Sequence, residues 1–271
     1  MMSDPGLLDR LVADVQSNDK YRNIEPGLIR WVGETELRSQ PSFKEAVKST
    51  RSRLHQACAA FQEAKIDYPR WTVELEALPG DVADPNLQGL CYRLMRLHAS
   101  TRERLPFLET FYASTLTHLP PVHSIIDLAC GLNPLALPWI PTAEDVRYEA
   151  CDIYVDMVGF INHFFSHIQL DGRAFTMDLT HSFPVGSFDL ALLLKTLPCL
   201  EQLDKSIAPG LLDSIRARYL LVSFPARSLG GRSKGMVANY EAHFLQLIAG
   251  RNWTFQRFEF PTELAFLVST T

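Results

Sequence analysis

The sequence predicts a Rossmann-like α/β domain that follows a helical N-terminal part. After residue 122 the chain consists of short apolar, strand-like runs, and the earlier runs alternate with segments of helix length. This is the pattern of a doubly wound parallel sheet. Before that point apolar residues recur at three- and four-residue steps, the period of amphipathic helices. We therefore expect a helical domain over residues 1–115 and an α/β domain over residues 116–271.

The composition is that of an ordinary soluble globular protein. Of 271 residues, 46% are hydrophobic and 21% are charged. No apolar run is long enough to span a membrane, and the polar start MMSDPGLLDR lacks the pattern of a signal peptide. The five scattered cysteines form neither a disulfide framework nor a CxxC metal pair. We expect a cytoplasmic protein without a bound metal and, because no dimerisation motif is present, a monomer.

One helix of the N-terminal part can be placed in detail. Residues 42–64 carry apolar side chains at mostly helical spacing, Ser42 is a candidate N-cap, and Glu45 completes a capping box. The segment LPGDVADPN (78–86) has the composition of a linker and interrupts the helical pattern.

The charge around this helix is unlike that of the whole chain. Residues 38–70 contain seven Lys or Arg and three acidic residues, whereas the chain has a formal net charge of −5. Such a stretch is either a basic face for a polyanion, with Arg51 and Arg53 as phosphate contacts, or a solvated helix face.

The strand-like runs end in an expected hairpin. They are HSIIDLAC, VRYEACDI, RAFTMDL, FDLALLLKTL, RYLLVSFP, WTFQRFEFP and LAFLVST. Only Pro261, Thr262 and Glu263 separate the last two, so we expect these two to pair antiparallel at one edge of the sheet.

In open α/β sheets, ligands bind beyond the carboxyl ends of the strands, and the first three of these ends are acidic here. The first run ends in Asp127-Leu-Ala-Cys-Gly, whose small residues let a ligand approach the backbone. Asp152, after the second run, is suited to accept hydrogen bonds from ribose hydroxyls. Asp178 and Leu179, after the third run, are suited to bind an adenine amino group and pack on its ring.

Each acidic strand end alone is more often a turn or cap residue than a ligand. Three of them in sequential register, one with a glycine turn, favour a nucleoside-containing cofactor. Because the sequence lacks GxGxxG, we expect S-adenosylmethionine rather than a dinucleotide.

Four longer motifs carry a family resemblance. LHASTRERLPFLETFY, DLACGLNPLALPW, LLLKTLPCLE and SFPARSLGGRSKGMVANY together resemble the aminoglycoside-resistance 16S rRNA methyltransferases, which methylate N7 of guanosine 1405 in the ribosomal decoding site. The resemblance runs from about residue 20 to the last strand. It implies a Rossmann-like S-adenosylmethionine-dependent methyltransferase domain behind a helical domain that docks on the small ribosomal subunit.

The resemblance also implies a set of cofactor-binding residues, with Arg104 as a clamp for the methionine carboxylate, a role that suits a guanidinium. Members of the family can have Gln where Leu203 stands, so Gln202 is an alternative contact there. The residues implied are Phe61, His98, Ala99, Ser100, Arg104, Ala129, Asp152, Asp178, Leu179, Leu194 and Leu203.

The implied chemistry needs no general base, because guanine N7 has a free lone pair and no proton. Catalysis can rest on in-line placement of nucleophile, methyl group and sulfur. We expect Lys195, after the fourth run, to position the target nucleotide; the alternative is a salt bridge at the sheet edge.

Target access is a separate requirement, since N7 faces the deep and narrow major groove of A-form RNA. The base must be exposed or flipped. The basic, glycine-containing segment 225–236 offers Arg227, Arg232 and Lys234 as RNA contacts, or is simply a mobile loop. Two other functions stay open: a cofactor-binding ribosome-associated factor without turnover, and a methyltransferase acting on a small molecule.

Overall fold

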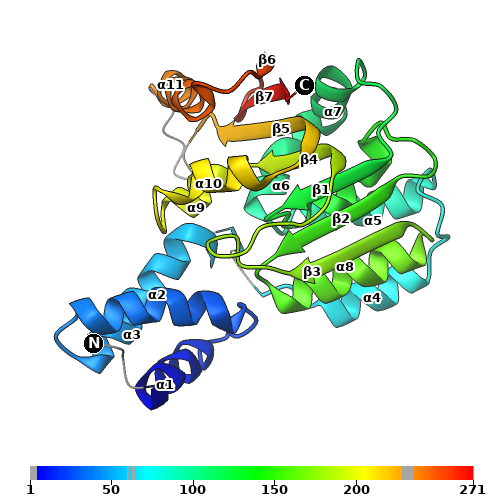
Figure 1. The fold of residues 1–271 in the computed structure, drawn as a ribbon. Helices are drawn as coiled ribbons and strands as arrows, with labels where there is room; N and C mark the ends of the chain where they lie inside the picture. Colours follow the sequence, from blue (N-terminus) through cyan, green and yellow to red (C-terminus); the bar gives the residue numbers. More distant parts are fainter. Residues whose placement is uncertain (1–4, 60, 63–64, 228–234, 271) are drawn as a thin grey trace.

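One seven-stranded sheet organises the described part of the chain, with strand order β3-β2-β1-β4-β5-β7-β6 (Figure 1). The structure is a computed structural model and describes residues 5–59, 61–62, 65–227 and 235–270. The strands are β1 (Ser124–Leu128), β2 (Arg147–Asp152), β3 (Asp171–Thr176), β4 (Phe188–Leu194), β5 (Ala217–Pro225), β6 (Thr254–Glu259) and β7 (Glu263–Ser269). All seven predicted strands are confirmed.

The strand order places a topological switch point between β1 and β4. Strands β1 to β5 pair in parallel, and the chain leaves β1 toward β2 and β3 on one side but continues with β4 and β5 on the other. Ligands bind at such a point in open α/β sheets. The predicted hairpin is also confirmed, since β6 and β7 pair antiparallel. Strand β7 also pairs antiparallel with β5, and β6 is the edge strand.

The helices cover both faces of the sheet. In β4, Leu190 and Leu192 pack into the same core as helices α1 to α5, α7 and α8, whereas Ala191 and Leu193 pack with α9 to α11, as the two-residue period of a strand requires. The helices are α1 (Pro5–Gln16), α2 (Pro26–Ser39), α3 (Phe43–Leu54), α4 (Tyr68–Glu76), α5 (Pro85–Met95), α6 (Ala99–Arg104), α7 (Leu108–Leu116), α8 (Val155–His167), α9 (Thr196–Glu201), α10 (Ile207–Ser214) and α11 (Met236–Ile248).

The N-terminal helices fall into two groups in space. Helices α1, α2 and α3 lie together beyond the carboxyl ends of β1, β2 and β3 (Figure 1). Helix α4 instead contacts α8, and α5 and α7 contact the 3₁₀ helix η3 (Asn133–Trp139). The chain before the sheet is helical as predicted, but α4 to α7 share a core with the sheet. A domain boundary at residue 115 therefore stays a prediction.

The helix expected over residues 42–64 is shorter than predicted. Its start is confirmed, because Ser42 Oγ accepts a hydrogen bond from the Glu45 amide at 3.3 Å. The α-helix ends at Leu54 and continues as a π-helical turn, η1 (His55–Ala59). Such turns are frequent at functional sites. Residues 60, 63 and 64 lie outside the described part of the chain.

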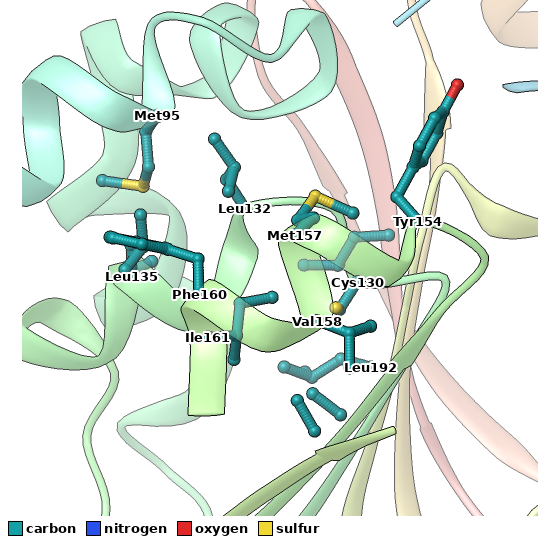
Figure 2. Packing of buried hydrophobic residues seen from close by; sticks show 14 of the residues in the cluster. Met95, Cys130, Leu132, Leu135, Tyr154, Met157, Val158, Phe160, Ile161 and Leu192 are labelled. Carbon is teal, nitrogen blue, oxygen red and sulfur yellow. The ribbon is translucent and has the colours of Figure 1, made fainter. Parts of the chain in front are cut away.

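The turn after β1 is anchored by apolar side chains. Figure 2 shows Leu132 and Leu135 beside Met157, Phe160 and Ile161 of α8, and all five belong to one buried cluster. This packing fixes the path of the small-residue turn beneath the ends of β1 and β2. Across the described residues, no helix has the length and apolar character needed to cross a membrane.

Candidate functional site

A cavity lies at the carboxyl ends of β1, β2 and β4. Together with its opening to solvent, it contains about 730 Å³ of space not occupied by protein atoms. Ten predicted residues line it, namely Phe61, His98, Ser100, Ala129, Asp152, Asp178, Leu179, Leu194, Lys195 and Leu203. Ala99 and Arg104 do not line it. Gln202, the alternative to Leu203, is exposed and does not line the cavity either.

The turn after β1 brings backbone to the cavity edge. Ala129 and Gly131 have positive φ angles of 51° and 53°. The His98 ring lies directly on Gly131, where an added Cβ would come within 2.6 Å of His98 Cε1. Only glycine therefore suits this position, because it tolerates both the conformation and the close contact.

Asp152 is held at the end of β2 by backbone amides. Its Oδ2 accepts from the Gly131 amide at 2.8 Å, and its Oδ1 accepts from the Ile153 and Tyr154 amides at 2.7 and 3.3 Å. Burial raises the pKa of Asp152, and the three amide donors oppose that shift. The result is a buried carboxylate fixed in place at the cavity wall and able to accept further hydroxyl donors.

Asp178 and Leu179 follow β3, and both line the cavity. Asp178 Oδ1 accepts from the Thr180 amide at 2.9 Å and from the Thr180 hydroxyl at 2.7 Å, so the loop is shaped by its own aspartate. Leu179 is buried beside it. The pair combines an acceptor with an apolar surface, as the sequence predicted.

His98 presents a neutral imidazole to the cavity. Its ring stacks on Phe61 with centroids 5.9 Å apart, and its Nδ1 is buried without a hydrogen-bond partner among the described residues. Burial, with the nearby Lys195 charge second, lowers the pKa of His98 to about 4. The neighbouring Ala99 contributes through its backbone, which donates to the Phe61 carbonyl at 2.8 Å.

Arg104, the expected carboxylate clamp, is paired within the protein core. Its guanidinium donates to both carboxylate oxygens of Glu263, at 3.1 and 2.6 Å, and to Asn133 Oδ1 at 2.9 Å. The side chain is 1% exposed. The guanidinium is thus buried and paired in a bidentate manner with Glu263, and the role of Arg104 as a carboxylate clamp stays a prediction.

Lys195 makes the ion pairs of the alternative role and also lines the cavity, and its role in positioning the target nucleotide stays a prediction. It lines the cavity, has a left-handed backbone with φ 62°, and caps α9. Its Nζ also pairs with Glu103 Oε2 at 2.6 Å and lies 3.7 Å from Glu263 Oε2. The ammonium is thus both held by carboxylates and placed at the cavity wall.

A buried polar network beneath the cavity was missed by the sequence analysis. Asp127 Oδ2 accepts from Asn133 Nδ2 and from the Tyr148 hydroxyl, each at 2.8 Å. The Tyr112 hydroxyl donates to Asn133 Oδ1 at 2.6 Å. Burial raises the pKa of Asp127 to about 7, against the lowering effect of Asn133 and Tyr148. Asp127 itself does not line the cavity.

Glu263 was also missed, although it is fully buried at the start of β7. It accepts from Arg104 and, at 2.5 Å, from the Ser223 hydroxyl. Burial opposes its ionisation, yet Arg104 and Lys195 hold the pKa of Glu263 below its ordinary value. A glutamate inside the apolar run PTELAFLV was the available signal, since buried acids are rare unless paired.

The predicted RNA contacts have different surroundings. Arg51 donates to the Asp14 carbonyl, and Arg53 donates to Glu36 and to the Leu203 carbonyl. Arg227 is exposed after β5. Arg232 and Lys234 lie outside the described residues. Among the residues described, no cluster of His, Cys, Asp or Glu is arranged to hold a metal ion.

Solved structures share this architecture across the whole chain. The 16S rRNA methyltransferase RmtF in complex with S-adenosyl-L-homocysteine matches with a TM-score of 0.83 and 31% identity, covering 99% of this chain and 100% of that one. The 16S rRNA methylase RmtB matches with a TM-score of 0.80 and 28% identity over 100% of both chains. The fold is therefore that of a Rossmann-like S-adenosylmethionine-dependent methyltransferase.

Sequence comparison defines the family within that class. A family model described as ribosomal RNA methyltransferase (FmrO) matches residues 17–267. A 16S rRNA (guanine(1405)-N(7))-methyltransferase from Frankia casuarinae is 36% identical over 264 residues, 96% of this chain and 93% of the relative. A relative of the same name from Micromonospora echinospora is 32% identical over 263 residues, 96% of each chain. The chain belongs to the FmrO family of ribosomal RNA methyltransferases.

Proposed function

We propose that the protein transfers a methyl group from S-adenosylmethionine to N7 of guanosine 1405 in 16S rRNA, acting on the assembled small subunit and conferring aminoglycoside resistance. The observation that carries the proposal is the cavity at the β1/β4 switch point, lined by nine of the eleven cofactor-binding residues implied by the family resemblance and by Lys195. The relatives named for this reaction match nearly the whole chain.

The residues of the cavity fit the cofactor. Asp152 offers an amide-fixed carboxylate for ribose hydroxyls, and Asp178 with Leu179 offers an acceptor and an apolar surface for adenine. The buried Nδ1 of His98, which has no partner among the described residues, is free to hydrogen-bond a ligand, as donor or acceptor according to the tautomer. When bound, the cofactor supplies an electrophilic methyl group on a sulfonium sulfur.

The methyl acceptor needs placement more than activation, because guanine N7 already presents its lone pair. Lys195 stands at the cavity wall with its ammonium fixed by Glu103 and Glu263. We assign Lys195 to positioning the target nucleotide. Fixing the reacting groups in line is the kind of effect worth up to roughly 7–11 kcal/mol of a barrier.

Docking on the subunit completes the proposal. Arg227 is exposed directly after β5, and the basic segment 225–236 offers Arg232 and Lys234 beside it. The group formed by α1, α2 and α3 (Figure 1) offers the surface that recognises a folded ribosomal particle. We propose that the protein acts as a cytoplasmic monomer on the decoding site.

The test is methyl transfer from labelled S-adenosylmethionine to three acceptors: isolated small subunits, protein-free 16S rRNA and small-molecule mixtures. We expect label only in the subunits, at N7 of one guanosine, with resistance to kanamycin and gentamicin in cells. Cofactor and subunit binding without label transfer would instead support a binding factor without turnover. Label in a small molecule alone would identify a different substrate.

A further inference from the structure

Arg53 connects the N-terminal helices to the wall of the cavity. From α3, its Nη2 donates to the Leu203 carbonyl at 2.8 Å, and its Nη1 pairs with Glu36 of α2 at 3.1 Å. Leu203 follows α9 and lines the cavity. Arg53 is 27% exposed and Glu36 only 7% exposed. One guanidinium therefore joins three segments, α2, α3 and the segment after α9.

The same helices form part of the cavity itself. Leu28 of α2 and Ala57, Cys58 and Phe61 after α3 line it opposite the strand ends. The π-helical turn that carries Ala57 and Cys58 also contacts α9. The position of α3 thus helps set the shape of the cavity.

Further contacts hold this helical group at other points on the cavity rim. Ile24 pairs with Tyr154 in an isolated β-bridge, and Tyr154 lines the cavity. The Trp31 ring packs edge-on against His181, just beyond Thr180, with centroids 5.0 Å apart. These contacts fix α1, α2 and α3 beside the ends of β2 and β3. The hydrogen bond from Arg53 to Leu203 joins the same helices to the segment after α9.

We propose that Arg53 is a positioning residue for the cofactor, and that it holds the α9 wall of the cavity instead of contacting rRNA phosphate. A guanidinium suits this role because it presents several donors in a fixed plane, so it can bind a carboxylate and a carbonyl at once. Removing it takes the Arg53 donor from the Leu203 carbonyl and one of several donors from the buried Glu36, which also accepts from Gln40. The inference rests on the proposed function only for the identity of the cofactor.

The experiment compares Arg53→Ala and Arg53→Lys with Arg38→Ala in the full-length protein. Arg38 is a matched control, since it also pairs with a glutamate, Glu34 of α2, but is 58% exposed and does not line the cavity. We measure S-adenosylhomocysteine affinity by calorimetry, the KM for S-adenosylmethionine and kcat with small subunits, and subunit binding across salt concentrations.

We expect Arg53→Ala to weaken S-adenosylhomocysteine binding on the order of tenfold, the scale of a lost charged hydrogen bond. The KM for S-adenosylmethionine should rise while kcat at saturation stays near that of the wild type. The salt dependence of subunit binding should not change. Arg53→Lys can satisfy one of the two acceptors, so its S-adenosylhomocysteine affinity should lie between those of Arg53→Ala and the wild type. Arg38→Ala should keep wild-type cofactor affinity.

Unchanged cofactor affinity in the folded Arg53 variants would overturn the proposal, and a salt slope shallower by about one for Arg53→Ala would identify Arg53 as a phosphate contact instead. If Arg53→Ala fails to fold, the Arg53→Lys affinity decides. Calorimetry also separates this inference from the function itself, because it reads cofactor binding even if the wild type methylates no subunit.

Discussion

The two sides of the cavity are built in different ways. On the β1–β2 side, Asp152 is fixed by the backbone amides of Gly131, Ile153 and Tyr154. On the β4–β7 side, Lys195 is held by charged side chains, among them Glu263, which is itself paired with an arginine. The first side relies on main-chain donors that most substitutions leave in place. The second relies on charges that depend on one another.

This difference separates binding from stability. Removing one partner of a buried ion pair leaves the other charge uncompensated, so the cost appears in folding. Removing Asp152 removes an acceptor at the cavity wall and also leaves backbone amides unpaired, so its cost appears in cofactor affinity as well as in folding. Substitutions on the two sides should therefore report different quantities.

The largest effect is expected for Glu263→Gln, which leaves the buried Arg104 guanidinium without its carboxylate. Loss of one partner of a buried pair costs about 3–5 kcal/mol. Denaturant unfolding measures this, with Glu259→Gln as control because Glu259 pairs with Arg257 at the surface of β6. A loss below about 1 kcal/mol would show that the pair contributes little to stability.

Beneath the same cavity, Asp127 should make stability depend on pH. Burial raises its pKa from 3.8 to about 7, so between these values the folded state holds a proton that the unfolded state has released. Stability contributed by the protonated carboxyl is therefore lost as pH rises from about 4 through 7, by about 4 kcal/mol in total.

The difference in unfolding free energy between wild type and Asp127→Asn isolates this effect. The subtraction is needed because His98, whose pKa burial lowers to about 4, acts in the opposite direction between its unfolded pKa of 6.5 and its folded one. A difference that does not change between pH 5 and 8 would contradict a raised pKa at Asp127.

Lys195→Gly should separate backbone strain from chemistry. Lys195 has φ 62°, a conformation that glycine adopts without strain, so any loss of stability in the variant comes from the lost ion pairs with Glu103 and Glu263 and is measured by denaturant unfolding before the assays. Without the ammonium the target nucleotide is misplaced, and misplacement by about 1 Å can cost about 100-fold in rate. We expect methylation of subunits to fall by about that factor with S-adenosylhomocysteine affinity retained.

The exposed Lys205→Gly provides the control, measured in the same methylation assay. If Lys195→Gly methylates subunits at the wild-type rate, Lys195 does not position the target nucleotide. Its role would then be limited to the ion pairs with Glu103 and Glu263.

On the β1–β2 side, Asp152→Ala should weaken cofactor binding by about 1.5–3 kcal/mol, the contribution of a hydrogen bond to a charged group. Calorimetry with S-adenosylhomocysteine measures it, and Asp145→Ala, an exposed residue before β2, is the control. Unchanged affinity in the folded Asp152→Ala protein would remove this carboxylate from the site.

The same contrast explains what the sequence could predict. Asp152, Asp178 and the turn at Gly131 follow strands directly, so the strand pattern and the rule that ligands bind at strand ends were sufficient to find them. Arg104 and Glu263 are 159 residues apart in sequence. No local pattern pairs them, so the sequence could not reveal this ion pair, whereas the predicted role of Arg104 as a carboxylate clamp came from the family resemblance.

The end of α3 was missed for a related reason. Apolar spacing over residues 42–64 is helical, and it does not distinguish an α-helix from the π-helical turn that begins at His55. The link from Arg53 to Leu203 uses a backbone carbonyl, which no side-chain pattern encodes. The sequence therefore predicted the strands and their acidic ends, whereas contacts between distant segments required the structure.

The smallest effect is expected at Arg227, away from both sides of the cavity. Its side chain is exposed after β5, so Arg227→Ala should leave folding and cofactor affinity unchanged. If Arg227 contacts one phosphate, its loss should reduce the salt slope of small-subunit binding by about one. A titration of subunit binding between low and physiological salt measures the slope, with exposed Arg216→Ala, before β5, as the matched control. Equal slopes for both variants and the wild type would place the phosphate contacts elsewhere on the protein.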